Sequence, residues 1–311
     1  MNSPTFDPIY STAVQAPQPP TPQNRFTVLT TSQLTSQNCQ PNWLVEGAFL
    51  HRQPAVIGGP AKSFKTSLAV DLAVSLATGT PFLGRFNVPS TQRVLFMSGE
   101  TMGNTLLARA RSVAVAKRID LAQYDPQIIW VERVPHLDNP ADLEEMWNML
   151  SAMKFAVAII DPLYYCLPRL SSQVSNLYTM GALLSQFAGT CLAAGTTPIF
   201  VHHVSKSAAE KKAGCAPTVS DLSQSGIGEF ARSWALVNHD PTVSDGAGQH
   251  HLLMRLGGSA GYESQWNLSI DVGELQTDFR GGKWEVRILP RDNSEPAPRR
   301  RRGLTLENPF E

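Results

Sequence analysis

The ten residues from Gly58 to Ser67, GGPAKSFKTS, constrain the fold of this chain more than any other segment. They follow the apolar run 54–57 and precede the stretch 67–79, whose apolar spacing predicts a buried helix. A strand, a glycine-rich turn, a Lys-Thr pair and a helix, in that order, form the context of a phosphate-binding loop. The backbone N–H groups of such a turn and of the helix N-terminus point at the phosphates of a nucleotide.

The loop supplies groups for a nucleotide and for its metal ion. Lys65 is expected to reach the β- and γ-phosphates, and the Thr66 hydroxyl is expected to ligate Mg²⁺. Phe64 departs from the pattern G-x-x-x-x-G-K-[ST], because it stands where the second glycine belongs. Since glycine tolerates backbone angles that a bulky residue disfavours, the alternative is a turn that binds nothing. The expected nucleotide-binding residues are Gly58, Gly59, Pro60, Ala61, Lys62, Ser63, Phe64, Lys65, Thr66 and Ser67.

Two carboxylates follow apolar runs further along the chain. Asp161 ends the run FAVAII, residues 155–160, and Glu100 follows the run RVLFM, residues 93–97. Both are expected at the carboxyl edge of the sheet, where open α/β sheets bind ligands. Asp161 is expected to hold Mg²⁺ directly or through water, and Glu100 to orient or deprotonate an attacking water. The alternatives are a strand-ending Asp-Pro turn for Asp161 and a helix cap for Glu100.

Histidines and arginines complete the candidate site. His202 and His203 follow the apolar run 198–201; His203 is expected to sense the γ-phosphate, whereas His202 is expected to be a packed core histidine. A zinc-ligand pair is the alternative, but adjacent residues of a strand point to opposite faces. Arg255, and less strongly Arg232, is a candidate arginine finger that reaches a neighbouring subunit's γ-phosphate, with an ordinary surface arginine as the alternative.

Two segments are candidates for contact with nucleic acid. Residues 206–224 are small and polar, which predicts a long mobile loop that begins at Lys206. Four consecutive arginines, Arg299–Arg302, lie near the end of the chain and are either a phosphate-backbone contact or a solvated tail. The chain has no net charge, so any contact with nucleic acid has to be local.

Apolar runs alternate with helical patterns along the middle of the chain. Strands are expected near residues 93–97, 127–134, 155–160 and 198–201, and helices near 104–117, 141–153 and 177–194. This alternation predicts an α/β fold with a mostly parallel, twisted sheet and helices on both faces. After about residue 234, short alternating runs separated by glycine-rich turns predict antiparallel strands that extend the sheet edge.

Composition divides the chain into three parts. Residues 1–40 are rich in Pro, Gln, Ser and Thr, which predicts a disordered tail with or without a partner. One domain is expected over residues 41–292, followed by a disordered basic tail over 293–311. No apolar run reaches the length of a membrane span, no secretory signal is evident, and the four cysteines are scattered. A cytoplasmic protein with reduced thiols and no membrane contact is therefore expected.

Residues 42–290 resemble the RecA-like P-loop ATPases, specifically the RepA/DnaB-type hexameric helicase-related group, often described as AAA-family domains. The resemblance is carried by the K-S-x-K-T form of the loop, in which the second glycine is commonly replaced, and by the segments LAVDLAVSLATGTPFLG and VLFMSGE. It implies that Glu100 is the catalytic base and Asp161 the Walker B aspartate. It also implies a sensor role for His203 with Lys206, and a finger role for Arg255 in the turn LLMRLGGSAG.

The same resemblance implies ATP and Mg²⁺ as cofactors, a homo-oligomer that is most commonly a hexamer, and an activity on DNA. Loop 206–224 and the arginine tail are then the expected DNA contacts. A nucleotide-switched module that binds DNA or a protein without unwinding stays open, because no accessory primase, zinc or DNA-binding domain is recognisable. A degenerate ATPase that binds nucleotide weakly because of Phe64 also stays open.

Overall fold

The computed structural model describes residues 29–36, 40–100, 103–167, 177–205, 214–223, 226–274 and 282–291. Internal contacts divide the chain into two units, Met1–Gln40 and Pro41–Glu311. The first unit contains a short helix, α1 (Thr31–Thr35), whose N-cap Thr30 exchanges hydrogen bonds with Gln33 in a capping box. Sequence analysis did not predict this helix inside the polar segment. The tail with Arg299–Arg302 lies outside the described residues.

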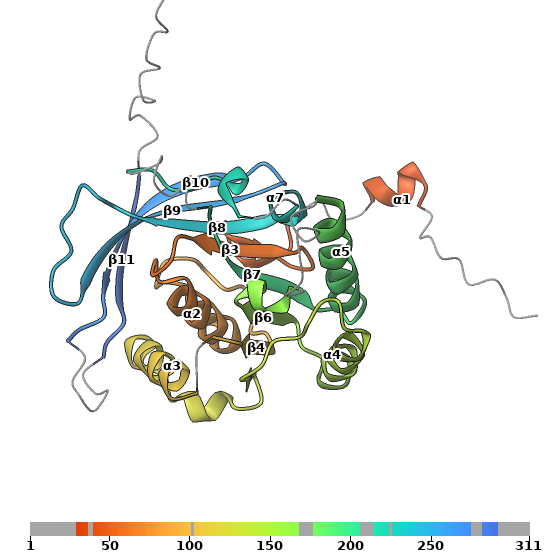
Figure 1. Ribbon diagram of the computed structural model, residues 1–311, viewed down its shortest axis with the longest axis horizontal. Helices are drawn as coiled ribbons and strands as arrows, with labels where there is room; N and C mark the ends of the chain where they lie inside the picture. Colours follow the sequence, from red (N-terminus) through yellow and green to blue (C-terminus); the bar gives the residue numbers. More distant parts are fainter. Residues whose placement is uncertain are drawn as a thin grey trace, which may run out of the picture. The chain divides into compact units, whose positions relative to one another are not determined.

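The second unit is built on a nine-stranded sheet with the order β11-β10-β9-β8-β3-β7-β6-β4-β5 (Figure 1). Neighbours from β8 to β5 pair in parallel, whereas β8, β9, β10 and β11 pair antiparallel. The strands are β3 (Ala55–Gly59), β4 (Val94–Ser98), β5 (Ile128–Val131), β6 (Val157–Asp161), β7 (Thr197–His203), β8 (Ser233–His239), β9 (Gln249–Gly258), β10 (Glu263–Asp271) and β11 (Glu285–Pro290). A separate two-stranded sheet joins β1 (Trp43–Val45) and β2 (Phe49–Leu50).

Helices cover both faces of the parallel strands because successive strand residues point to opposite faces. Ile57 of β3 packs in the hydrophobic cluster of α2 (Lys65–Thr78) and α3 (Gly103–Lys117). Val56, its neighbour, packs in the opposite cluster, with α4 (Pro140–Met153), α5 (Leu177–Ala193) and α7 (Ile227–Phe230). Short 3-10 turns lie at η1 (Leu121–Tyr124), η2 (Leu163–Cys166) and η3 (Val219–Asp221). The predicted α/β class, the mostly parallel sheet and the antiparallel edge are confirmed.

Local signals explain where several elements begin and end. The side chain of Asn139 accepts a 3.1 Å hydrogen bond from the N–H of Ala141, and Pro140 occupies the first turn of α4. This is the helix start that the Asn-Pro pair favours. Helix α2 ends at Gly79, whose φ of 74° suits glycine and closes the last turn through a hydrogen bond to the Ser75 carbonyl.

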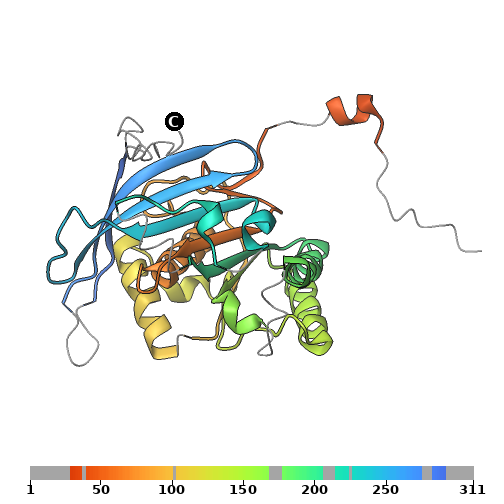
Figure 2. The same ribbon diagram turned by 45° about the horizontal axis from the view of Figure 1, so that its top comes forward.

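The antiparallel strands pack on the same face of the sheet as α2. Leu252, Met254 and Ile270 share one hydrophobic cluster with Leu72 and Leu76 of that helix. Figure 2 shows these blue strands continuing the sheet beyond β8. Helix α2 is therefore enclosed by the parallel strands and by the C-terminal strands. Among the described residues, no helix combines the length and the apolar character that a membrane crossing requires.

Candidate functional site

The parallel strands bring four predicted site segments to one edge of the sheet. Backbone register pairs Gly59, the last residue of β3, with His203, the last residue of β7. It likewise pairs Ser98 of β4 with Asp161 of β6. Strand β7 lies between β3 and β6. The glycine-rich loop, the Glu100 segment, Asp161 and His203 therefore all emerge at the carboxyl ends of neighbouring strands, where this class of sheet binds ligands.

The loop between β3 and α2 contains two residues in the left-handed backbone conformation. Lys62 has a φ of 61° and Phe64 a φ of 63°, and neither is a glycine. For an L-residue this conformation costs roughly 1–2 kcal/mol. Phe64 thus adopts the backbone φ that a glycine at this position would adopt without strain. Its ring packs on the His250 ring at a centroid distance of 4.6 Å. The substitution keeps the shape of the loop and adds strain to it.

Gly59 is a position where no side chain fits. A Cβ there would lie 2.5 Å from the Ser63 hydroxyl oxygen and 2.7 Å from the Val237 carbonyl oxygen. The Ser63 hydroxyl also donates a 2.8 Å hydrogen bond to the Pro60 carbonyl, which draws the loop into a tight turn. This close approach explains why the first glycine of the motif is present even though the second is replaced.

Lys65 is the buried cation of the site. Its side chain is 7% exposed, and its ammonium donates a 2.6 Å hydrogen bond to the Pro60 carbonyl oxygen. Burial lowers the pKa of Lys65 to about 8, although the charges of Asp161 and Glu100 oppose that shift. A negative ligand beside the ammonium would favour its charged form, so the group is suited to a polyphosphate.

Asp161 and Thr66 form a group of oxygen donors that suits Mg²⁺. Asp161 is 2% exposed, burial raises its pKa to about 6, and the Thr66 hydroxyl hydrogen-bonds to its carboxylate. The Oδ2 atom of Asp161 has no hydrogen-bond partner within the described residues. A buried acceptor without a partner is costly, and a hard cation with oxygen ligands would satisfy it. Asp161 and Thr66 therefore fit the metal that accompanies a nucleotide.

Glu100 and His203 lie on the same side of the site as Lys65. Glu100 is exposed on the wall of the cleft. Its negative charge opposes the lowering of the pKa values of Lys65 and His203. Burial is nevertheless the largest influence on His203, and together with the Lys65 charge it lowers the pKa of that imidazole. His203 is thus kept neutral near pH 7, in a form that can donate one hydrogen bond and accept another.

His202 faces the other side of β7 and belongs to the core. It is buried, and its Nε2 lies 2.8 Å from the carbonyl oxygen and 2.9 Å from the hydroxyl oxygen of Ser223. Burial lowers the pKa of His202 to about 4. This agrees with the expectation of a packed histidine. No group of three or more His, Cys, Asp or Glu side chains gathers as a metal cluster in the part of the chain that the structure describes.

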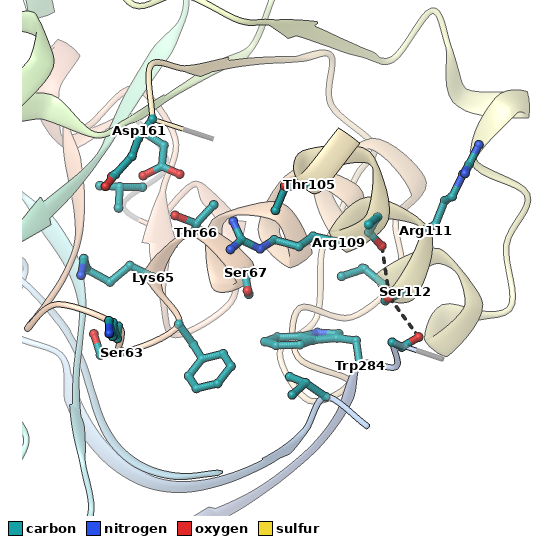
Figure 3. Close-up of a pocket in the computed structure, with 18 of the residues that line it drawn as sticks. Ser63, Lys65, Thr66, Ser67, Thr105, Arg109, Arg111, Ser112, Asp161 and Trp284 are labelled. Carbon is teal, nitrogen blue, oxygen red and sulfur yellow. Dashed lines mark hydrogen bonds between the residues drawn. The ribbon is translucent and has the colours of Figure 1, made fainter. Parts of the chain in front are cut away.

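Arg109 is a residue of the site that sequence analysis missed. It lies on α3. Burial lowers the pKa of its guanidinium, and the negative charges of Asp161 and Glu100 oppose that shift. The guanidinium therefore lies near both carboxylates. Figure 3 shows its side chain extending from α3 toward Thr66. The sequence did contain one indication of this wall of the site. The spacing of Thr105, Arg109 and Ser112 puts three polar side chains on one face of a helix.

One cleft of about 1070 Å³ connects these groups. Of the expected nucleotide-binding residues, the run Ala61–Ser67 lines it, whereas Gly58, Gly59 and Pro60 do not. Glu100, Asp161 and His203 line it as well. The residues that sequence analysis did not assign to the site are Thr105, Ala108, Arg109, Arg111, Ser112, Val113, Val115, Pro162, Val201, Val272, Gly273, Gly282, Lys283 and Trp284.

The two candidate finger arginines lie outside this cleft. Arg255 of β9 forms an ion pair with Glu263 of β10. Arg232 is exposed in the turn before β8. Neither arginine lines the cleft of its own chain.

The expected mobile loop 206–224 is partly folded. Residues 214–223 include η3, where Asp221 accepts hydrogen bonds from the backbone N–H and the hydroxyl of Thr218 at 2.7 Å each. Ser205 donates a backbone hydrogen bond to the Asp221 carbonyl, and Leu222 is buried. The described part of the predicted loop is thus held by the Thr218–Asp221 cap and by a hydrogen bond from the Ser223 N–H to the His203 carbonyl of β7, and its mobility stays a prediction. Lys206 and residues 206–213 and 224 lie outside the described residues.

Comparison with known proteins agrees with this geometry. A family model described as an AAA domain matches residues 19–209 of the chain. Because the match spans more than half of the sequence, the chain belongs to this AAA-domain family, whose members are P-loop ATPases. No curated protein matched the sequence.

Proposed function

We propose that this protein binds ATP with Mg²⁺ and hydrolyses it as a RepA/DnaB-type ATPase that acts on DNA in an oligomeric ring. The observation that carries the proposal is the convergence of Lys65, Asp161 and Glu100 on one cleft at the sheet edge. Nucleotide hydrolysis requires three kinds of group, and the cleft contains all three. Lys65 is the buried cation, Asp161 is the buried carboxylate with an unsatisfied oxygen, and Glu100 is the exposed carboxylate.

Each side chain has a role that follows from its surroundings. The Lys65 ammonium, released from the Pro60 carbonyl, would neutralise charge on the β- and γ-phosphates. Thr66 and Asp161 would hold Mg²⁺, which supplies further neutralisation of the phosphates when it is bound. Glu100 is exposed to solvent, so it can position or deprotonate a water molecule that attacks the γ-phosphate. The neutral His203 would hydrogen-bond to the same phosphate.

Two arginines are assigned different parts in the proposal. Arg109 would contribute positive charge within its own chain, because it already lies near Asp161 and Glu100. Arg255 would act on the nucleotide of a neighbouring subunit, after leaving its ion pair with Glu263. Contact with DNA would come from loop 206–224 and the Arg299–Arg302 tail.

Two observations favour a second candidate, a nucleotide-switched module that assembles on DNA or a partner without unwinding. Arg255 is held by Glu263 within its own sheet, and the chain as a whole carries no net charge. A finger that is restrained in this way, on a chain without a basic surplus, suits a switch better than a processive motor.

Two measurements on the wild-type protein separate these functions. The first is the mass of the protein with and without Mg²⁺ and a non-hydrolysable ATP analogue. The second is strand displacement on a forked DNA duplex with ATP. The helicase proposal predicts a nucleotide-dependent ring and ATP-dependent displacement. Nucleotide-dependent assembly without strand displacement would support the switch, and a monomer under all conditions would contradict the trans role of Arg255.

A further inference from the structure

Phe64 occupies the N-cap position of α2, but it cannot cap the helix with a side-chain hydrogen bond. The usual capping residues accept a hydrogen bond from an N–H group of the first helical turn, and a phenylalanine side chain has no atom that does so. The cap residue therefore takes up none of the N–H groups that a phosphate would use. Because Phe64 also has a φ of 63°, contacts of its ring have to hold it in place.

The ring of Phe64 has two kinds of contact. It packs against the hydrophobic cluster that includes Leu252 of β9, and it packs on the imidazole of His250 from the same strand. The two ring centroids are 4.6 Å apart and the ring planes are inclined at 49°, which is within the range of stabilising aromatic pairs. Since Phe64 directly precedes Lys65 and Thr66, a shift of its backbone would move both of these residues.

Asp245 fixes the orientation of the His250 ring from the turn between β8 and β9. Burial acts to raise the pKa of Asp245, but hydrogen bonds from His250 and from the N–H of His251 lower it, so the carboxylate is ionised near pH 7. An ionised carboxylate only accepts, so the Nδ1 atom of His250 donates the 2.9 Å bond to Oδ2. The other oxygen accepts the N–H of His251 at 3.1 Å. The imidazole is thereby held beside Phe64.

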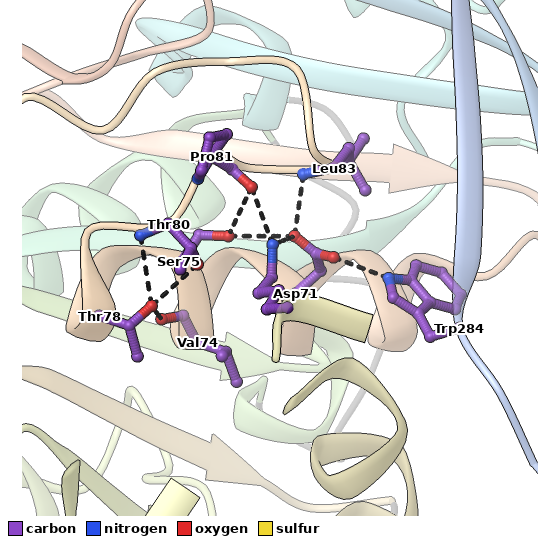
Figure 4. A network of polar contacts seen from close by, with 9 residues as sticks. Asp71, Val74, Ser75, Thr78, Thr80, Pro81, Leu83 and Trp284 are labelled. Carbon is purple, nitrogen blue, oxygen red and sulfur yellow. Dashed lines mark hydrogen bonds and ion pairs between the residues drawn. The ribbon is translucent and has the colours of Figure 1, made fainter. Parts of the chain in front are cut away.

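Helix α2 is anchored separately from the loop, by a polar network around Asp71 (Figure 4). This carboxylate accepts hydrogen bonds from the indole N–H of Trp284 at 2.7 Å and from the backbone N–H of Leu83 at 2.9 Å. It also lies 3.1 Å from the ammonium of Lys117 on α3. Because these contacts fix the helix, strain at Phe64 is relieved by movement of the loop, and the loop needs a support of its own.

We propose that His250 is a positioning residue of the phosphate loop, whose ring holds Phe64 in the left-handed conformation in which the loop binds a nucleoside triphosphate. The inference rests on the proposed function, because it concerns the affinity for Mg-ATP. His250 does not line the cleft, whereas Phe64 does, so His250 acts through Phe64. A loop that is in its binding conformation for only part of the time binds more weakly in proportion to that fraction.

The proposal is tested by calorimetry of Mg-ATP binding to the full-length protein. His250→Ala is expected to weaken binding about fivefold, the size of effect that loss of an aromatic contact has. His250→Phe keeps a ring beside Phe64 and is expected to stay within about twofold of wild type. His251→Ala is the matched control, because the next side chain of β9 points to the other face and lies 3.2 Å from the Ser269 hydroxyl. It is expected to leave the affinity unchanged.

A second background separates positioning of the loop from a general loss of stability. Glycine adopts a φ of 63° without strain, so a loop with Phe64→Gly does not need the His250 ring. Adding His250→Ala to Phe64→Gly is therefore expected to leave Mg-ATP affinity within about twofold of Phe64→Gly alone. Steady-state hydrolysis gives another readout. His250→Ala is expected to raise KM about fivefold and to keep kcat within about twofold, since the loop holds the phosphates in the ground state and the transition state alike.

The outcomes distinguish this inference from the proposed function. If wild type binds no Mg-ATP, both fall. If wild type binds and hydrolyses ATP, equal binding by His250→Ala contradicts the positioning role alone. The same holds if His250→Phe binds as weakly as His250→Ala, or if His250→Ala costs as much in the Phe64→Gly background as in wild type. His250→Asn keeps a donor for Asp245 and lacks the ring, so it replaces His250→Ala if that variant does not fold. A fivefold loss is again expected, and wild-type affinity would overturn the proposal.

Discussion

The indole N–H of Trp284 donates a hydrogen bond to the carboxylate of Asp71 although 213 positions of sequence separate the two residues. The bond joins the C-terminal strands to α2, the helix that begins at Lys65. The same carboxylate forms a buried ion pair with Lys117, at the end of α3. One side chain in the middle of α2 therefore links α2, α3 and the residue before β11, three of the parts of the chain that line the cleft.

Asp71→Ala is expected to destabilise the protein by about 3–5 kcal/mol, because it leaves the buried Lys117 ammonium without its counter-ion. Urea unfolding of the purified variant measures this loss. The double variant Asp71→Ala/Lys117→Met is expected to be more stable than Asp71→Ala alone, since no uncompensated charge remains. If the two substitutions were strictly additive, the ion pair would not be coupled as the structure indicates.

Phe64→Gly and Phe64→Ala isolate the backbone strain of the loop. Both remove the ring and its contact with His250, but only glycine adopts a φ of 63° without steric cost. The glycine variant is therefore expected to be more stable than the alanine variant by about 1 kcal/mol, although alanine normally favours folding over glycine. Thermal unfolding of the pair gives the difference. An alanine variant that is equally or more stable would show that the loop is not held in this conformation.

The raised pKa of Asp161, about 6, predicts a pH-dependent effect of Asp161→Asn. The folded protein holds a proton on this carboxyl up to about pH 6, whereas the unfolded chain loses it near the ordinary value of 3.8. The contribution of Asp161 to wild-type stability therefore falls as pH rises from about 4 to about 6 and stays lower above that range. Asp161→Asn lacks this titration.

Without ligand, the stability of Asp161→Asn minus that of wild type is accordingly expected to be roughly 2–3 kcal/mol larger at pH 8 than at pH 4. Urea unfolding at both pH values measures this change. The exposed Asp138→Asn is the control and should show no such gain. A pH-independent difference for Asp161→Asn would contradict the burial of an ionisable carboxylate at this position.

Arg255→Ala and Glu263→Gln test the finger that the helicase proposal requires. If Arg255 acts on a neighbour's nucleotide, Arg255→Ala lowers turnover about a thousandfold while ATP binding is preserved. Glu263→Gln, which removes only the partner of the ion pair, should keep turnover near wild type. Steady-state hydrolysis and equilibrium ATP binding are measured on both. Equal, small effects of the two variants on turnover would assign the arginine to the stability of the sheet alone.

Much of this arrangement was predictable from the chain alone, because its signals are local. An apolar run that ends in Asp161 or leads to Glu100 specifies both a buried strand and the place of its last side chain. Because these strands run parallel, their carboxyl ends then lie at one edge of the sheet. The departure from the motif at Phe64 was also visible in the sequence, because the motif has a glycine at that position. Only the structure shows that Phe64 adopts the positive φ that a glycine would adopt there.

The rest depends on contacts between distant segments. Arg109 lies on a helix whose sequence pattern gives no reason to rank one polar side chain above Thr105 or Ser112. Trp284 lines the cleft while its indole N–H is bonded to Asp71, and no periodicity links residues so far apart. The fold of 214–223 likewise follows from a cap between Thr218 and Asp221 inside a segment of loop-like composition.

The role of Glu100 in hydrolysis is tested by the turnover and the ATP binding of Glu100→Gln. The substitution removes the exposed carboxylate and leaves Lys65, Thr66 and Asp161 in place, so single-turnover hydrolysis and Mg-ATP affinity are measured on the same preparation. Hydrolysis is expected to fall at least about a hundredfold, because a general base is lost, while ATP affinity stays within a few-fold of wild type. Hydrolysis at the wild-type rate would contradict the assignment of this cleft as the hydrolysis site.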